Sequence, residues 1–441
     1  MGSSPPTSSS SDAESEDENE EFGRLLNIKS DDFLALGEKI LHDILKITFT
    51  STSESRIIDK CFGSFNIVHI LEFDGEHKIV IRVPITGKSG SLEGVACQAI
   101  ESQVQTMRHI RANTTIPIPE VYCFDGTDNN EISAPYIAMA YIPGVNVGKM
   151  WFNNDGGVEE RRLKILSQLA GFSCQLGKLR FEAIGSLLPP LPSENTMSSI
   201  GPCFDWVQPE EDPDDVGVTS FGPFSTSDSW LRHSWTPTIR NPKDHYGIAC
   251  SKILEAMFPH LPQTPPHYTL TMPDFDSQNV MVDDDGNVTG LIDWDNAQTM
   301  PDYLGFARFP GWITRDWDPL MYHWPHSDRE NSPEELHRYR QHYFREMKTI
   351  LAATGSKDYH LTEKSHIFEA FYIAIANRQH TIPICVKFVE EVIRALPEGN
   401  AFDNLDWKPL GVLLDIAYGE LEEEPWLQLQ TGLERLMALS E

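Results

Sequence analysis

The chain has 441 residues, which is enough for a large hydrophobic core and is typical of two or more lobes or domains. It carries 66 acidic and 35 basic residues, a formal net charge of -31, and this excess argues against nucleic acid and anionic membranes as partners. A cationic small molecule would be attracted to such a surface, although acidic residues also serve solubility.

The cysteines and the hydropathy pattern indicate the compartment. The seven cysteines show no Cys-x-x-Cys spacing, and the N-terminus is polar, unlike the basic and apolar start of a signal sequence. No uninterrupted apolar run reaches the length of a membrane span. We therefore expect free thiols, a cytoplasmic location and no membrane partner.

Residues 1–22 are predicted to be a disordered acidic tail. The segment begins with Ser and Pro and continues with Asp and Glu, with almost nothing apolar among them. Such a segment cannot bury enough surface to offset the entropy of ordering its backbone.

A helix and three strands are predicted after the tail. Ser30 is the expected N-cap of the helix, whose apolar residues recur on one face. Strands are expected over residues 57–66, 67–73 and 78–83, with Gly63 in the first connection. The helix face consists of Phe33, Leu36, Ile40, Leu41 and Ile44.

The rest of the chain is predicted to be mainly helical. A helix over about 92–111 precedes a strand within 134–144, and a long amphipathic helix then runs to about Arg180. Residues 188–242 are rich in Pro, Gly and Ser, so we expect an irregular stretch that either covers a binding site or is a tolerated surface insertion. Ser332-Pro333-Glu334-Glu335 is a capping box that predicts another helix, ending at Gly355.

The segment LTMPDFDSQNVMVDDDGNVTGLIDWD carries the chemistry of the chain. An Asp followed five positions later by an Asn, here Asp274 and Asn279, can place a base beside a hydroxyl and an amide oxygen on Mg²⁺. Residues 280–292 read as a hairpin, so Asp293 should lie near Asn279 and share the cation. A calcium loop of the EF-hand type is excluded, because it would place Ile292 where the bidentate Glu belongs.

These residues resemble the signature of the aminoglycoside phosphotransferase and choline kinase family, which is His-Gly-Asp-x-x-x-x-Asn followed by Ile-Asp-Trp-Asp or Ile-Asp-Trp-Glu. The resemblance implies an α+β, two-lobe, protein-kinase-like fold with a small antiparallel sheet in the N-lobe and a mainly helical C-lobe. The N-lobe would cover residues 23–142 and the C-lobe residues 143–441. The implied reaction transfers the γ-phosphoryl group of ATP to a hydroxyl of a small molecule.

The resemblance also implies roles for single residues. Asp274 would be the catalytic base, Asn279 and Asp293 would hold Mg²⁺, and catalysis would rest on positioning and charge neutralisation. The residues implied to bind ATP are Gly63, Ser64 and Phe65 in the covering loop, Arg82 on the third strand, and the backbone of Ala140 and Ile142.

Two departures from the family pattern favour an alternative, a catalytically silent module that binds a nucleotide or metabolite. Met272-Pro273 replaces the family's His-Gly. Gln103 stands where a Glu should orient the cation of the third strand, and Glu101 is two residues away, about 200° around the helix.

Overall fold

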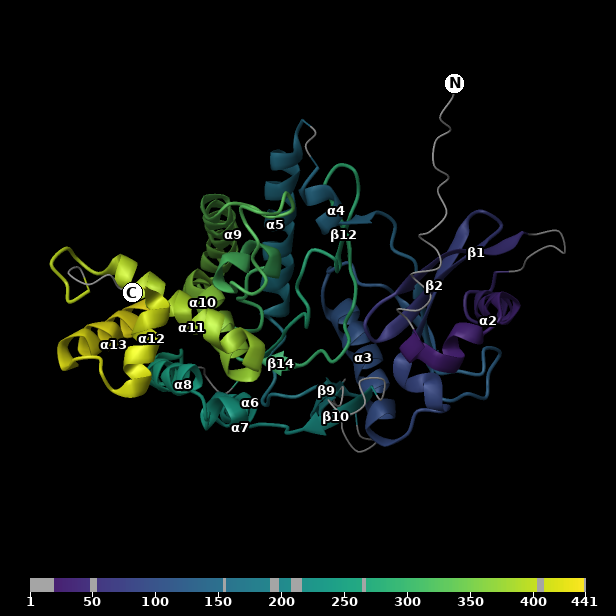
Figure 1. The fold of residues 1–441 in the computed structure, drawn as a ribbon. Helices are drawn as coiled ribbons and strands as arrows, with labels where there is room; N and C mark the ends of the chain where they lie inside the picture. Colours follow the sequence, from purple (N-terminus) through teal and green to yellow (C-terminus); the bar gives the residue numbers. More distant parts are fainter. Residues whose placement is uncertain are drawn as a thin grey trace, which may run out of the picture.

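In the computed structural model, residues 20–47, 54–153, 156–190, 198–207, 216–263, 267–402 and 408–439 are described. Nearly all of the predicted acidic tail therefore lies outside the described residues. Two lobes are visible in Figure 1: a sheet with helices, coloured purple to blue, and a mainly helical lobe, coloured green to yellow.

The N-lobe is built on a five-stranded antiparallel sheet in the order β1-β2-β3-β5-β4. The predicted first three strands are confirmed, and the expected helix on the C-terminal side of β3 is also present. The lobe contains η1 (Glu20–Asn27), α2 (Ser30–Asp43), β1 (Ser55–Phe62), β2 (Asn66–Phe73), β3 (His77–Pro84), η2 (Ile85–Ser89), α3 (Gly94–Asn113), β4 (Val121–Asp125) and β5 (Tyr136–Ala140).

Helix α2 packs its apolar face on β1 and β2. Gly37 makes this approach possible, because a Cβ there would lie 2.6 Å from Phe73 Cζ. Two details of the prediction are wrong. Lys29, with an extended backbone, is the N-cap and Ser30 is already helical, while Ile44 follows the helix and is 42% exposed.

The ordered part of the N-lobe starts earlier than residue 23. Phe22 is fully buried, with its ring centroid 5.8 Å from that of Phe62, so the predicted tail boundary is too late. Arg24 donates hydrogen bonds to the backbone oxygens of Gly87, Lys88 and Ser133 at 2.7–2.8 Å. Residues 20–27 thus hold η2 and the approach to β5 in place.

The C-lobe is mainly helical, as expected. Its helices are α4 (Val147–Trp151), α5 (Val158–Leu176), α6 (Ser227–Ser234), α7 (Pro237–Arg240), α8 (His245–Met257), η3 (Phe258–His260), η4 (Gly311–Ile313), η5 (Arg315–Trp317), α9 (Pro333–Ala353), α10 (Tyr359–Ala376), α11 (Arg378–Ala395), α12 (Pro409–Tyr418) and α13 (Glu423–Met437). Its strands are β6 (Val145–Asn146), β7 (Leu187–Leu188), β8 (Ser199–Ile200), β9 (Cys203–Val207), β10 (Gly217–Phe221), β11 (Thr269–Leu270), β12 (Val280–Val282), β13 (Val288–Leu291) and β14 (Thr299–Met300).

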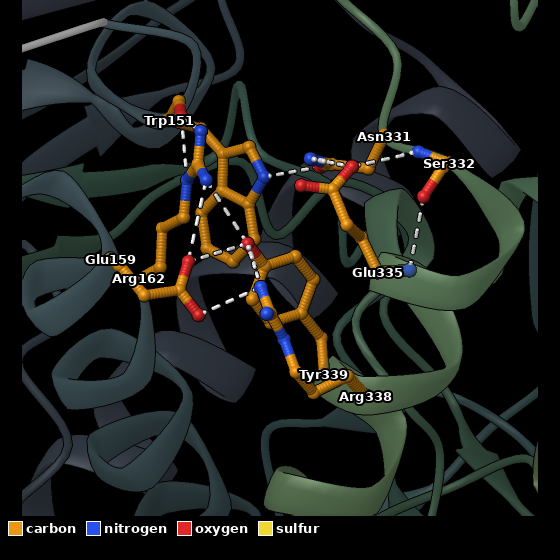
Figure 2. Close-up of polar contacts among 8 residues, drawn as sticks. All are labelled: Trp151, Glu159, Arg162, Asn331, Ser332, Glu335, Arg338 and Tyr339. Carbon is orange, nitrogen blue, oxygen red and sulfur yellow. Dashed lines mark hydrogen bonds and ion pairs between the residues drawn. The ribbon is translucent and has the colours of Figure 1, made fainter.

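A polar network joins α4, α5 and α9 (Figure 2). Trp151 Nε1 donates to Asn331 Oδ1 at 2.7 Å, and Arg162 of α5 donates to the backbone oxygen of Trp151 and to the Tyr339 hydroxyl of α9. The predicted capping box at Ser332 is confirmed, with both reciprocal hydrogen bonds to Glu335. These contacts fix the entry of α9 against α5.

The expectation of an irregular stretch over residues 188–242 is wrong for its described part. Strands β9 and β10 form an antiparallel hairpin, and α6 and α7 follow. The hairpin lies between the two lobes, next to α3 (Figure 1), and β10 packs on that helix. The acidic residues between β9 and β10, which are Glu210, Glu211, Asp212, Asp214 and Asp215, lie outside the described residues.

The burial of Phe22 gives a prediction about stability. Deleting residues 1–19 is expected to change the free energy of unfolding by no more than about 0.5 kcal/mol, as for other surface changes. Phe22→Ala is expected to lower it by about 3–5 kcal/mol, because it removes a large ring from a packed core. Urea unfolding of both variants measures the difference, and equal midpoints would show that Phe22 does not pack on the fold.

Candidate functional site

The loop that carries Asp274 is held by hydrogen bonds to its backbone oxygens. Arg308 Nη2 donates to the Met272 backbone oxygen at 3.1 Å, and Gly311 N donates to the Phe275 oxygen at 2.7 Å. Met272 is itself buried in the apolar core. Burial of the Met side chain and a guanidinium on its carbonyl therefore shape a loop that lacks the imidazole.

Asp274 lines a cavity, and two hydrogen bonds hold its carboxylate in place. Its Oδ2 accepts hydrogen bonds from Gln278 Nε2 at 2.7 Å and from Asn279 Nδ2 at 3.0 Å. Partial burial raises the pKa of Asp274, and the carboxylate of Asp276 adds to the rise. A carboxylate with a raised pKa at a cavity wall is suited to accept a proton.

The structure brings Asn279 and Asp293 to the same end of the predicted hairpin. Strands β12 and β13 pair as expected, and Ile292 N donates to the Asn279 oxygen at 2.9 Å. Asp293 has φ of 65°, in the left-handed region that non-glycine residues rarely adopt. Trp294 is fully buried and donates to the Leu291 oxygen at 3.1 Å, which anchors this strained turn.

Arg82 crosses from β3 to the turn that carries Asp293. Its Nη2 lies 2.9 Å from Asp293 Oδ1 and 2.9 Å from Asp295 Oδ2, and its Nη1 lies 2.8 Å from Asp295 Oδ1. Asn66 Nδ2 donates to Asp295 Oδ2 at 2.8 Å. The two carboxylates thus share one guanidinium that is 10% exposed.

The pKa values reflect this sharing. Burial works against the charge of Arg82, but Asp295 and Asp293 outweigh it and raise the pKa of the guanidinium. Burial raises the pKa of Asp295 to about 6, although Arg82 acts in the opposite direction. Desolvation therefore matters for Asp295, whereas the side chain of Asp293 is 40% exposed.

Gln103 faces Arg82, as its spacing indicates, but does not bind it. Both residues line a cavity of about 30 Å³ together with Asp295. Gln103 is 7% exposed, and its Nε2 has no hydrogen-bond partner within the described part of the chain. The orienting partner of the β3 cation therefore comes from the C-lobe rather than from α3.

The predicted covering loop, residues 63–65, connects β1 and β2. Gly63 N donates to the Asn66 oxygen at 2.9 Å, and Gly63 and Ser64 are exposed. Phe65 stacks on Trp206 of the β9–β10 hairpin, with ring centroids 4.4 Å apart and planes at 10°. The inserted hairpin thus contacts the loop directly.

The same hairpin lines the cavity in front of Asp274. This cavity has a volume of about 450 Å³. Phe204, Asp205 and Phe221 line it from the hairpin, and the other lining residues come from positions 271–373. The described part of residues 188–242 therefore contributes to the wall of the cavity, and its role as the cover of a binding site stays a prediction.

The connection between the lobes carries Ala140 and Ile142, whose backbone contacts with adenine stay predictions. Ala140 N already donates to the Glu120 oxygen at 2.9 Å, so this donor is used within the protein. Ile142 packs its side chain over Gly290, where a Cβ would lie 2.6 Å from Ile142 Cγ2. A backbone contact from Ile142 to adenine stays a prediction.

Charged residues after Asp293 mainly form ion pairs. Asp302 pairs with Arg180 at 2.6 Å, and Asp316 forms a buried bidentate pair with Arg340. Arg315, which lines the 450 Å³ cavity, pairs with Asp276 at 2.7 Å. Most of these residues therefore support the walls.

Sequence reasoning missed four residues of the site: Asn66, Asp295, Arg308 and Trp206. The second Asp of Ile-Asp-Trp-Asp was visible in the motif, and its spacing of two from Asp293 was the available signal. The other three gave none, because their roles depend on contacts over 36 to 229 positions in the chain.

Comparison with known proteins identifies the family. The model of the phosphotransferase enzyme family matches residues 93–346, more than half of the chain. The chain therefore belongs to this family, and its two-lobe, kinase-like fold agrees with that assignment.

Similar proteins cover parts of the chain. A subtelomeric hrmA-associated cluster protein of Aspergillus fumigatus is 30% identical over 125 residues, which are 28% of this chain and 23% of that protein. Altered inheritance of mitochondria protein 9, mitochondrial, of Lachancea thermotolerans is 23% identical over 219 residues, which are 44% of this chain and 34% of that protein. The chain thus matches only about a quarter to a third of the length of these relatives.

Among solved structures, Plasmodium vivax ethanolamine kinase matches with a TM-score of 0.35 and 11% sequence identity. The match covers 84% of this chain and 85% of the kinase chain.

In the described part of this chain, no helix has both the length and the apolar composition needed to cross a bilayer.

The Phe65–Trp206 stack gives a prediction about coupling between the lobes. In a double-mutant cycle, Phe65→Ala and Trp206→Ala are expected to couple by about 0.5–1.5 kcal/mol in the free energy of unfolding, as stacked aromatic pairs do. Val207→Ala, on the same strand but exposed, is the matched control and should be additive with Phe65→Ala. Additive effects of the Phe65 and Trp206 changes would show that the stack contributes nothing.

Proposed function

We propose that the chain is an ATP- and Mg²⁺-dependent phosphotransferase that moves the γ-phosphoryl group to a hydroxyl of a small molecule. The observation that carries this proposal is the placement of Asp274: its carboxylate faces a 450 Å³ cavity and is hydrogen bonded by Asn279, which the motif assigns to the metal. Base and metal ligand are thus adjacent, as phosphoryl transfer requires.

The residues present fit Mg²⁺. Asn279 uses its Nδ2 on Asp274, so its Oδ1 remains the acceptor end of a fixed amide. Asp293 adds a carboxylate that is 40% exposed. Two hard oxygen donors suit a cation that keeps water and phosphate oxygens in its shell.

Each residue has a distinct task in the proposed reaction. Asp274 orients the acceptor hydroxyl and accepts its proton, and Arg82 binds phosphate oxygens through its planar fork. Bound Mg²⁺ would neutralise phosphate charge. Gly63 allows the backbone of the covering loop to approach the phosphates, with Ser64 and Phe65 beside it.

The cavity supports a cationic acceptor. Its lining includes five carboxylates, Asp205, Asp274, Asp276, Asp318 and Glu369, and two guanidiniums, those of Arg308 and Arg315. Aromatic walls of the kind formed by Phe204, Phe221, Phe275, Trp317 and Tyr372 also favour a cation over their ring faces.

The cytoplasm remains the proposed compartment. All seven cysteines lie within the described residues and all are free thiols, which agrees with a reducing environment.

The silent binding module remains the second candidate. Two observations favour it: Arg82 is engaged by Asp293 and Asp295 instead of being free for phosphate, and the amide of Gln103 replaces a carboxylate. Measuring ATP consumption against a library of hydroxylated metabolites and aminoglycosides separates the two candidates, since only an enzyme turns over.

Nucleotide binding is tested by thermal melting. Mg-ATP at about one hundred times its Kd is expected to stabilise the protein by about 2.7 kcal/mol. Asp293→Asn should abolish the Mg²⁺-dependent part, because it removes a charged metal ligand. Asp284→Asn makes the same chemical change in the exposed hairpin turn and should melt like the unmodified protein. If saturating Mg-ATP leaves the melting temperature of the unmodified protein unchanged, the proposal of nucleotide binding is refuted.

The roles of Asp274 and Asn279 are separable by kinetics. Asp274→Asn is expected to reduce phosphoryl transfer by about 10²–10⁴-fold, the usual contribution of a general base, with almost unchanged Mg-ATP affinity. Asn279→Ala should weaken both phosphoryl transfer and Mg-ATP affinity, because Asn279 is the proposed metal ligand and also donates a hydrogen bond to the Asp274 carboxylate. Rates and nucleotide Kd values are measured with an acceptor found in the screen, and full transfer by Asp274→Asn would refute the assignment of the base.

A further inference from the structure

The charge of the Asp293–Asp295 pair is already partly balanced by a side chain of the protein, the guanidinium of Arg82. All three short contacts of Arg82 go to these two carboxylates, at 2.8–2.9 Å, and they include both Oδ atoms of Asp295. Arg82 and Asp295 have side chains only 10% and 15% exposed, so the contact is poorly screened by water and salt. The ligand-free protein thus has a positive charge beside the carboxylate that is proposed to bind Mg²⁺.

Nothing on α3 competes for Arg82. Gln103 is neutral, and although it lines the same small cavity, its Nε2 makes no hydrogen bond with any described residue. Asp295 is in contrast fixed by a second donor, Asn66. The preferred resting position of the guanidinium is therefore between the two carboxylates of the C-lobe.

We propose that Arg82 is the resident counter-ion of the Asp293–Asp295 pair, and that a divalent cation enters this pair only together with phosphate groups that bind Arg82 in turn. Asp295 is then the positioning residue for Arg82 and takes the place of the missing acid on α3. The inference rests on the proposed function, because it assigns the order in which metal and nucleotide occupy that site.

The argument is one of charge balance. Two neighbouring carboxylates repel each other and attract any available cation, and a buried carboxylate without a partner is strongly destabilising. While Arg82 is present, a bare divalent ion must approach a guanidinium as well as the carboxylates. A triphosphate changes the balance, since a guanidinium fork binds phosphate oxygens as well as it binds carboxylate. The metal would then take the place of Arg82 at the carboxylates, and the phosphate groups would take the place of the carboxylates at Arg82.

Manganese binding without nucleotide tests this directly. Mn²⁺ is titrated into the full chain, and the free ion is followed by electron paramagnetic resonance. Arg82→Met, which removes the charge but keeps an unbranched side chain, is expected to bind Mn²⁺ more tightly than the unmodified protein by on the order of tenfold, from Coulomb's law across a few ångströms. Adding Asp293→Asn to Arg82→Met should reverse the gain.

Arg56→Met is the control. It also removes a guanidinium from an ion pair, but Glu72 keeps its contact with Lys78, so Mn²⁺ binding should stay as in the unmodified protein. Arg82→Lys provides a variant that keeps the charge near the pair but lacks the fork, and a gain smaller than that of Arg82→Met is expected. Circular dichroism confirms that each variant is folded before titration.

A second titration separates this inference from the proposed function. A non-hydrolysable ATP analogue is expected to promote Mn²⁺ uptake by the unmodified protein. Tight Mn²⁺ binding by the unmodified protein alone, equal to that of Arg82→Met, would overturn the role of Arg82 while leaving the phosphotransferase proposal intact. Tight binding only in Arg82→Met, with no effect of the analogue on the unmodified protein, would support Arg82 as the counter-ion, but it would overturn the joint entry of metal and phosphate and count against nucleotide binding.

Discussion

The contact of Arg82 with Asp293 and Asp295 is the constraint on which the arrangement of the two lobes depends. It joins the third strand of the N-lobe sheet to the turn after β13, across more than 200 positions of the chain. A buried ion pair of this kind adds little net stability, because desolvation offsets most of the attraction. Its importance is geometric, since removing either partner leaves the other charge buried and costs about 3–5 kcal/mol.

Other contacts across the lobes follow from this alignment. Leu291 N donates to the Pro117 oxygen at 2.8 Å, which ties the hairpin of the metal residues to the segment between α3 and β4. A continuous apolar cluster, which includes Val104 of α3 and Leu166 of α5, fills the space behind it. The strained φ of Asp293 is therefore held from three sides: by a buried Trp294, by strand pairing and by the guanidinium.

The fold class was expected from the resemblance to a known family, and the local pattern of the sequence was sufficient for the first three strands, the β12–β13 hairpin and the capping box of α9. Each of these depends on residues close together in the chain, where periodicity and turn chemistry act directly. The boundary of the tail was misplaced because a single Phe22 among acids has no periodicity, although its burial is complete.

The site was predictable only in part. The Asp274, Asn279 and Asp293 set follows from one motif, so its proximity could be inferred from a hairpin. The partner of Arg82 could not, because the neutral Gln103 removed the expected acid and the replacement came from the other lobe. Residues 188–242 likewise looked irregular, since a hairpin whose strands pack against two lobes shows no simple alternation of apolar and polar residues.

The β9–β10 hairpin has a consequence for attempts to change what the protein acts on. Phe204 and Phe221 shape the cavity in front of Asp274, while Trp206, on the same short strand as Phe204, packs on the covering loop through Phe65. Replacing the hairpin to admit a different molecule would therefore also displace the covering loop, residues 63–65. The selectivity of the 450 Å³ cavity could not be redesigned without altering this loop.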